Sequence, residues 1–197
     1  HYHVAGRGTP LLMMAPGGMN SRIDHWRDKN VWAAMQPLDS LTAEFTVIAY
    51  DRREAGASGG RVEALTWDAY AREARGLLDH LGIERAWLLG GCMGCSVALA
   101  VAARFAERVS GLLLHWPVGG YRWYQRCRGM FDRHRAFAAA HGLAAVVGRA
   151  RAGEPFPAAP DGGPWASVLA RDAAFAAHYA KLDRDAYLAL VARSRDA

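Results

Sequence analysis

Short, mostly apolar runs recur along the first 120 residues of the chain, and longer amphipathic segments separate them. Four of these runs lack the alternation of a half-exposed strand, so we predict strands that are buried on both faces of a sheet. They lie at residues 11–14, 46–50, 86–89 and 109–114. Residues 1–5 are expected to contribute a further strand, so the first part of the chain is expected to be built on a sheet.

The segments between these runs predict helices. Residues 67–81 carry apolar side chains at helical spacing, with Thr66 as the N-cap and Gly82 as the residue that ends the helix. Further helices are expected over 31–38, with a break at its proline, and over 93–105. Strand and helix therefore alternate, which indicates an α/β fold with a mostly parallel sheet and flanking helices.

The pattern changes after residue 120. Residues 121–135 are rich in aromatic and basic side chains, and no strand is indicated from there on. Helices are expected over 136–150 (with a break at Gly142), over 165–179, and from a cap at Asp183 to Val191, with a proline-rich loop over 154–164. The chain is therefore expected to divide into a core of residues 1–120 and a helical cap, or lid, of residues 121–197.

The composition is that of a globular protein with a substantial core. Hydrophobic residues make up 52% of the 197 positions. No apolar run approaches the roughly 18 residues of a membrane span. The formal net charge of +5 comes mainly from arginine, without a motif that would bind a nucleic-acid groove. We therefore expect neither a membrane partner nor a nucleic-acid partner.

The three cysteines, at positions 92, 95 and 127, do not predict a disulfide framework, because their number is odd and two share one tight turn. This favours a reducing compartment and hence a cytoplasmic protein. Neither the cysteines nor the histidines show a second ligand pair at zinc spacing, so no metal and no cofactor are expected.

The candidate chemistry centres on residues 90–94, Gly-Gly-Cys-Met-Gly, between a predicted strand and a predicted helix. This is the pattern small-x-nucleophile-x-small, the sharp turn that carries a nucleophile at its apex. Gly90 and Gly94 have no side chain to collide where strand and helix approach. Free amides and the helix dipole at this N-terminus would favour a thiolate at Cys92.

Three interpretations of Cys92 stay open from the turn alone. It can be a small buried core residue. It can be one half of a redox pair, since Cys92-Met-Gly-Cys95 after a strand is also the thioredoxin arrangement. It can be the nucleophile of a hydrolase, in which case it needs an oxyanion hole and a general base.

A second glycine motif follows the strand at 11–14. Pro16 has no amide hydrogen and ends the strand, while Gly17 and Gly18 free the backbone to point its amides at a ligand. The motif is either an ordinary Pro-Gly-Gly turn or one half of an oxyanion hole.

Four loops are expected to meet at one edge of the sheet, because the carboxyl ends of parallel strands lie together and carry the ligand sites of such sheets. They carry Gly17 and Gly18, Asp51, Cys92, and His115 with Trp116. Asp51 is expected to brace its loop through hydrogen bonds to the backbone. The residues predicted to line a substrate pocket are Trp26, His115 and Trp116.

Two histidines of the sequence are candidate bases for Cys92. His115 ends a strand beside the turn and could reach the thiol, although a pocket-lining or core histidine is favoured there. His134 has arginine-rich neighbours, which favours a solvated face.

Four segments occur in the order and spacing of the α/β-hydrolase superfamily, which the chain resembles over residues 1 to about 120. They are residues 10–18, 48–58, 77–83 and 88–94. The chain looks most like the hydrolases of small esters, lactones and C–C bonds, and the cysteine apex is similar to that of dienelactone hydrolase. The resemblance implies that Cys92 attacks a carbonyl while the amides of Met93 and of Gly17 or Gly18 hold the oxyanion. Ala15 and Pro16 stand where the family usually has His-Gly.

The resemblance also implies an acid and a histidine on strands that follow the lid. No such strand is indicated, so we expect the chain to be truncated at its C-terminus, with two or three strands and the rest of the triad beyond residue 197.

The sequence therefore predicts a hydrolase that attacks small ester, lactone or related carbonyl substrates through Cys92. The alternatives are a thiol–disulfide protein that uses Cys92 and Cys95, and a non-catalytic binding protein with the hydrolase fold. A small-molecule substrate is the expected partner, and a homo-oligomer stays open.

Overall fold

The structure, a computed structural model, describes residues 1–18, 20–60, 66–118, 120–153 and 165–194. Contacts divide it into two compact units. The first consists of residues 1–60 and 66–118, and the second contains the described residues from 120 onwards.

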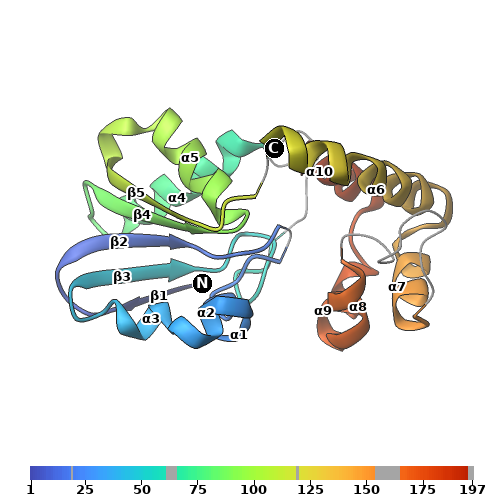
Figure 1. The fold of residues 1–197 in the computed structure, drawn as a ribbon, viewed down its shortest axis with the longest axis horizontal. Helices are drawn as coiled ribbons and strands as arrows, with labels where there is room; N and C mark the ends of the chain where they lie inside the picture. The colour runs from blue at the N-terminus through green and yellow to red at the C-terminus, as the bar shows by residue number, and fades with distance from the viewer. Residues whose placement is uncertain (19, 61–65, 119, 154–164, 195–197) are drawn as a thin grey trace. The chain divides into compact units, whose positions relative to one another are not determined.

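The first unit is built on a five-stranded sheet in the order β1-β3-β2-β4-β5 (Figure 1). Its strands are β1 (Tyr2–Ala5), β2 (Thr9–Met14), β3 (Phe45–Tyr50), β4 (Ala86–Gly91) and β5 (Val109–His115). Strand β1 pairs with β3 in the antiparallel sense, and the other pairs are parallel. Leu12 lies opposite both Ile48 and Leu88, so the apolar runs meet at the centre of the sheet.

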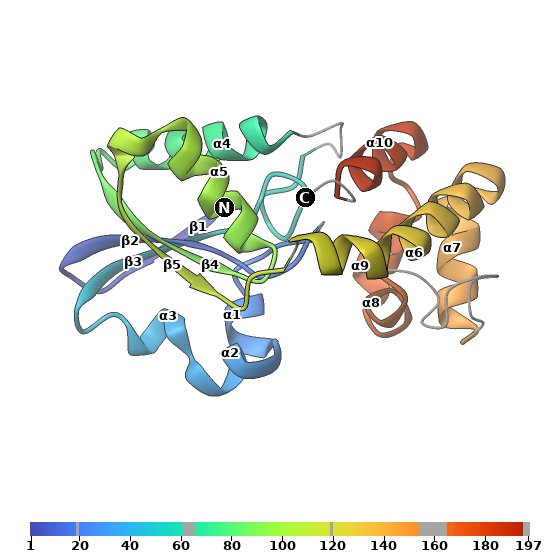
Figure 2. The same ribbon diagram turned by 45° about the horizontal axis from the view of Figure 1, so that its top comes forward.

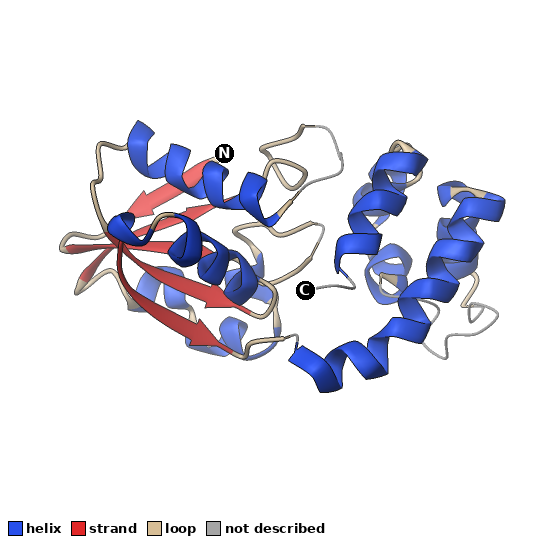
Figure 3. Ribbon diagram, turned by 90° about the horizontal axis from the view of Figure 1, so that it is seen from above, coloured by secondary structure: helices blue, strands red, loops and turns tan. Residues whose placement is uncertain are grey.

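Helices cover both faces of this sheet (Figure 3). One face carries α4 (Trp67–His80) and α5 (Gly94–Arg104), and the other carries α1 (His25–Asp28), α2 (Asn30–Met35) and α3 (Pro37–Ser40). A 3-10 helix, Ala106–Arg108, leads from α5 to β5. Leu12, Ile48 and Leu88 on one face have no exposed surface, nor do Leu11 and Val47 on the other, so the central strands are buried on both sides. The prediction that the strand at 109–114 is also buried on both faces is wrong, because β5 is an edge strand that leaves Leu113 (39%) and Leu114 (38%) exposed. The predicted α/β fold with a mostly parallel sheet and flanking helices is confirmed.

Local signals place most of the element ends. The hydroxyl of Thr66 accepts a hydrogen bond from the Ala69 N–H (3.0 Å) and caps α4 as predicted. The break expected in the helix over 31–38 occurs at Gln36, which has a φ of 45° and separates α2 from α3. Strand β4 is two residues longer than predicted, because Gly90 and Gly91 stay in register with β5.

The second unit is helical in its described residues (Figure 2). Its helices are α6 (Gly120–His141), α7 (Leu143–Arg151), α8 (Ala166–Arg171), α9 (Ala173–Tyr179) and α10 (Arg184–Ser194). The aromatic and basic segment at 121–135, for which the pattern predicts no helix, lies within α6. None of the helices in the described part of the chain is both long enough and apolar enough to cross a membrane.

Two helix predictions have different outcomes in this unit. Asp183 caps α10 as predicted, since its Oδ1 accepts from the Ala186 N–H at 2.7 Å. The helix expected over 165–179 is instead two helices, because Asp172 accepts from the Phe175 N–H at 2.8 Å and starts α9. The loop expected over 154–164 lies outside the described residues.

His134 is buried inside the second unit, with 1% of its surface exposed, and does not lie on a solvated face as expected. Its Nε2 lies 2.5 Å from the hydroxyl oxygen of Tyr187, which also accepts from the indole N–H of Trp165 at 2.9 Å. Helical spacing explains the difference, because His134 shares its inward face with Phe131 and Ala138. Burial lowers the pKa of His134 to about 4.

This burial is expected to make the second unit sensitive to acid. The unfolded chain binds a proton at His134 near the ordinary pKa of 6.5, whereas the folded chain binds it only near 4. The free energy of unfolding is therefore at its full value above pH 6.5 and falls as the pH drops towards 4. The expected fall is about 3 kcal/mol for this one group.

Urea unfolding of the whole chain across this pH range measures the effect. The variant His134→Gln cannot take up the proton and is expected to show a flatter dependence. An equally steep dependence in that variant would contradict the assignment to His134.

Candidate active site

Cys92 lies on the turn between β4 and α5, at the carboxyl end of the central strands. Its φ of 53° is in the left-handed region, which residues with a side chain rarely adopt. Two backbone hydrogen bonds hold this conformation: the Cys92 N–H donates to the His115 carbonyl (3.1 Å), and the Cys92 carbonyl accepts from the Cys95 N–H (3.0 Å). The turn is therefore a strained feature that its surroundings maintain.

The glycines around Cys92 are required by close backbone contacts. A Cβ on Gly94 would lie 2.1 Å from the Met14 carbonyl oxygen, and one on Gly90 would lie 2.6 Å from the Cys95 Cα. These distances confirm the prediction that strand and helix approach too closely for side chains at these two positions.

The glycine motif after β2 reaches the same sulfur. The backbone amides of Gly17 and Met93 both lie near the Cys92 thiol, and both act to lower its pKa. Gly17 has a φ of 114°, which a residue with a side chain would rarely adopt. The turn and this loop therefore present two amides, from distant parts of the sequence, to one sulfur atom.

The pKa of the Cys92 thiol is nevertheless raised, because burial outweighs the two amide hydrogen bonds. The helix N-terminus alone therefore does not make Cys92 a thiolate, in contrast to what the turn motif favours. A thiol in this state needs a base to remove its proton before it can attack.

Cys95 is more deeply buried than Cys92, with 1% of its surface exposed. Its thiol lies 3.0 Å from the Gly90 carbonyl oxygen, to which it donates. Burial, and then the neighbouring Cys92, raise the pKa of the Cys95 thiol to about 11. Both cysteines are free thiols.

Aromatic side chains pack beside the turn. A Cβ on Gly91 would lie 2.8 Å from the Trp26 ring and 3.1 Å from the Trp32 ring. Trp26 has no exposed surface and supports the turn from the core side, whereas Trp116 is 60% exposed and has a φ of 58°. The ring of Trp32 contacts those of Trp26 (5.8 Å) and Trp116 (6.3 Å).

His115 is tied to the turn through its backbone. Its carbonyl accepts from the Cys92 N–H, and the Cys95 thiol lies 3.5 Å from the same oxygen. Its imidazole lies edge-on to Trp32, with 5.6 Å between ring centroids. The structure therefore places His115 beside the candidate nucleophile, with its side chain against an aromatic ring.

Asp51 braces its loop as predicted. One carboxylate oxygen accepts from the Ile23 N–H (2.7 Å) and the other from the Ala57 N–H (2.8 Å). A Cβ on Gly56 would lie 2.3 Å from the same carboxylate, so the loop closes tightly over Asp51.

Sequence reasoning missed a buried ion pair next to this loop. Arg52 is 4% exposed, with its Nε 3.3 Å from a carboxylate oxygen of Glu54, and its Nη2 donates to the Gly17 carbonyl at 3.1 Å. Its guanidinium also lies 4.6 Å from the centre of the Tyr70 ring. Burial, and then the charge of Glu54, raise the pKa of the nearby Glu73 to about 7. A charged residue in a polar loop gave no signal that it would be buried.

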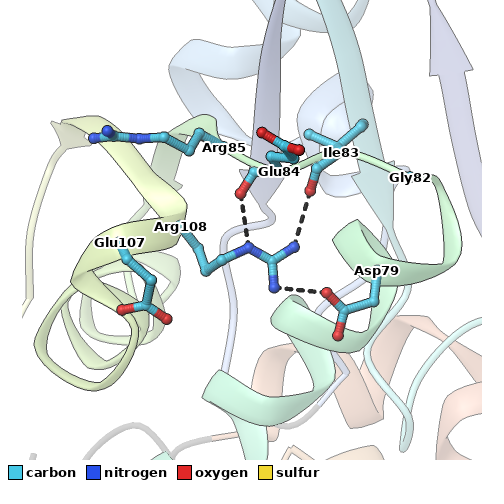
Figure 4. A pocket seen from close by; sticks show the side chains of 7 residues that line it. All are labelled: Asp79, Gly82, Ile83, Glu84, Arg85, Glu107 and Arg108. Atoms are coloured by element: carbon cyan, nitrogen blue, oxygen red, sulfur yellow. Dashed lines mark hydrogen bonds and ion pairs between the residues drawn. The ribbon is translucent and has the colours of Figure 1, made fainter.

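Among the described residues, His, Cys, Asp and Glu side chains do not gather in groups of three or more that could hold a metal ion. A hollow of about 500 Å³ lies at the opposite end of β4 from Cys92 (Figure 4). Arg108 crosses it and donates to the Ile83 carbonyl (2.9 Å), the Glu84 carbonyl (2.7 Å) and the Asp79 carboxylate (2.6 Å). These bonds engage all three guanidinium nitrogens, so the arginine holds this end of the sheet together.

A mostly parallel α/β sheet with a strained residue at a strand-to-helix turn, beside the loop that follows β2, is the arrangement of the α/β-hydrolase class of proteins. The chain belongs to the alpha/beta hydrolase fold family, whose family profile matches residues 10–143.

Two curated relatives show this similarity in sequence. A 2-hydroxy-6-oxo-6-phenylhexa-2,4-dienoate hydrolase from Comamonas testosteroni is 32% identical over 124 residues, which is 60% of this chain and 40% of that protein. A 2-hydroxymuconate semialdehyde hydrolase from Pseudomonas sp. (strain CF600) is 35% identical over 118 residues, which is 59% of this chain and 39% of that protein. The chain thus matches about two fifths of the length of these relatives.

Solved structures show the same fold. A hydrolase from Pseudomonas aeruginosa PA01 has a TM-score of 0.60 and 23% identity, over 99% of this chain and 68% of that one. The enol-lactonase from Burkholderia xenovorans LB400 has a TM-score of 0.57 and 22% identity, over 97% of this chain and 68% of that one.

Proposed function

We propose that Cys92 is the nucleophile of a hydrolase that acts on small ester, lactone or related carbonyl substrates. The observation that carries the proposal is the convergence of the Gly17 and Met93 amides on the Cys92 sulfur. A buried core cysteine has no need of two backbone donors, whereas a sulfur that attacks a carbonyl needs donors beside it.

The first half of the reaction forms a thioester. A base removes the thiol proton, the sulfur attacks the carbonyl carbon, and the π electrons of the C=O bond move to its oxygen. That oxygen then lies two bonds from the sulfur, where the amides of Gly17 and Met93 can donate to it. Each such donor is worth about 3 kcal/mol in the transition state. The bond to the leaving group then breaks, and the leaving group takes a proton.

The second half returns the free enzyme. Water attacks the thioester carbon, loses a proton to the base, and displaces the Cys92 sulfur, which is reprotonated. The raised pKa of Cys92 means that the base is essential to both halves. By the pattern of the α/β hydrolases, this base is a histidine that an acid holds in place.

The names of the relatives support a carbonyl substrate. A dienoate hydrolase, a semialdehyde hydrolase and an enol-lactonase share parts of this fold. A small molecule is therefore the proposed partner, and residues 121–197 are proposed to form its cap.

The redox alternative has weaker support. A resolving thiol must attack a disulfide or sulfenic acid as its thiolate. The thiol of Cys95 is buried, donates to a carbonyl, and has its pKa raised to about 11, so it carries little thiolate at neutral pH.

Covalent labelling tests the proposal. A fluorophosphonate or iodoacetamide probe is expected to modify Cys92 in the native protein, as located by peptide mass mapping. Labelling confined to Cys95 or Cys127 would contradict it. Tight binding of an ester without turnover, in a protein whose Cys92 is labelled, would instead favour a binding protein with the hydrolase fold.

A further inference from the structure

Three consecutive backbone carbonyls that follow β2 are each held by a side chain from elsewhere in the chain. The pairs are Ser21 Oγ with the Ala15 carbonyl (2.8 Å), His25 Nδ1 with the Pro16 carbonyl (2.7 Å), and Arg52 Nη2 with the Gly17 carbonyl (3.1 Å). The three side chains belong to residues that are 2%, 6% and 4% exposed. This loop is therefore fixed from the side opposite its amides.

The direction of a carbonyl fixes the direction of the amide in the same peptide unit, because C=O and N–H point in opposite directions across a trans peptide. The described residues contain no cis peptide bond. The Pro16 carbonyl and the Gly17 N–H belong to one peptide unit. When His25 holds the carbonyl on one side, the Gly17 N–H points to the other side, towards the Cys92 sulfur, whose pKa it acts to lower.

The protonation of His25 suits this contact. A carbonyl oxygen can only accept, so Nδ1 carries the hydrogen. Burial lowers the pKa of His25, which keeps the ring neutral. The imidazole also packs against the loop, since a Cβ on Gly17 would lie 3.2 Å from Nδ1. His25 therefore contacts both the carbonyl and the residue whose amide it directs.

We propose that His25 is a positioning residue: its hydrogen bond to the Pro16 carbonyl aims the Gly17 amide at the Cys92 sulfur. The proposal rests on the proposed function for its role in catalysis, because the same amide would then hold the oxyanion. Its geometry and its test concern the thiol and need no turnover.

The test compares two variants at His25 in the whole chain. His25→Leu removes the donor, so the Gly17 amide is no longer held towards the sulfur and the pKa of Cys92 rises. Alkylation of Cys92 by iodoacetamide near neutral pH is expected to be about 3- to 10-fold slower than in the unmodified chain. The two rates should converge at high pH, where both thiols are ionised. His25→Asn keeps an N–H donor near the position of Nδ1 and is expected to restore the rate to within about twofold.

Ser21→Ala is the matched control. It also removes a buried hydrogen bond to a carbonyl of this loop, but the next residue is Pro16, which has no N–H to redirect. It is expected to lower stability while leaving the pH profile of Cys92 alkylation unchanged. A profile in His25→Leu that matches that of Ser21→Ala would overturn the proposal, because it would reduce His25 to a stabilising contact.

A second measurement covers the case in which His25→Leu does not fold. The ¹⁵N resonances of the His25 ring in the unmodified chain are expected to show the neutral form with hydrogen on Nδ1. The Gly17 amide resonance is expected to shift when Cys92 is alkylated. The proposal would be overturned by a His25 ring with hydrogen only on Nε2, or by a Gly17 amide resonance that does not shift when Cys92 is alkylated. Labelling at a site other than Cys92 would refute the proposed function instead, and would leave the expected hydrogen on Nδ1 of His25 in place.

Discussion

Replacing Cys92 by alanine is expected to reduce hydrolysis of a small activated ester to the uncatalysed background. Loss of a nucleophile that acts together with its base costs a factor of about 10⁴ to 10⁶ in kcat. The turn itself is expected to persist, because its glycines and its backbone hydrogen bonds do not involve the thiol. Initial rates with p-nitrophenyl acetate measure the effect.

Cys95→Ser is the matched control for this variant. A hydroxyl keeps the donor that the Cys95 thiol directs at the Gly90 carbonyl, so the rate is expected to stay within a few-fold of the original. A full rate in Cys92→Ala together with a lost rate in Cys95→Ser would reverse the assignment of the nucleophile.

Replacing Gly94 by alanine is expected to prevent folding of the first unit or to destabilise it by at least about 3 kcal/mol. The added Cβ would lie 2.1 Å from the Met14 carbonyl oxygen and 3.0 Å from the Ala15 carbonyl oxygen. Both contacts are to backbone, which cannot move aside as a side chain can. Yield, far-UV circular dichroism and urea unfolding measure the loss.

Gly76→Ala separates this steric effect from the general effect of removing a glycine. Gly76 lies within α4, and a Cβ there would have no atom within 4 Å. This variant is expected to gain about 0.5–1 kcal/mol, because alanine loses less conformational entropy in a helix. Equal stability of the two variants would contradict the close approach of strand and helix at Gly94.

The elements of the first unit were predictable because each has a local cause. Apolar runs such as 46–50 are long enough for one buried strand, and Thr66 supplies a capping oxygen within its own turn. Gly90 and Gly94 allowed the close approach of strand and helix to be predicted. The motif small-x-nucleophile-x-small spans only five positions, so it can be recognised locally. Asp51 was predictable for the same reason, as its Ala57 partner lies six residues away.

What the sequence did not predict depends on partners that are distant along the chain. Arg52 is buried because Glu54 and Tyr70 surround it, and nothing in a polar loop indicates that environment. His134 is buried beside Tyr187 of α10, whose hydroxyl lies at its Nε2 and in turn accepts from the indole N–H of Trp165. The arginines next to His134 in the sequence favoured a solvated position for it. They lie on the outer side of α6, and one helix has both a solvated and a buried face.

In the candidate site, too, residues in local motifs were predictable, whereas properties that depend on distant partners were not. Cys92, Gly17 and Met93 could be identified from motifs. The protonation of the thiol could not, because burial raises its pKa whereas the two amides act to lower it. Trp26 was expected in a pocket and has no exposed surface, since it packs under Gly91. His25 gave no sequence signal, because its partner is a backbone carbonyl nine residues away.

The most direct test of Cys92 as nucleophile is to trap the covalent intermediate. The protein is mixed with p-nitrophenyl acetate, quenched in acid, digested, and mapped by mass spectrometry. We predict an acetyl group on the Cys92 sulfur that hydroxylamine removes and that is missing from Cys92→Ala. Acetylation at another residue during turnover, or an unmodified Cys92 in a protein that hydrolyses the ester at full rate, would contradict the account.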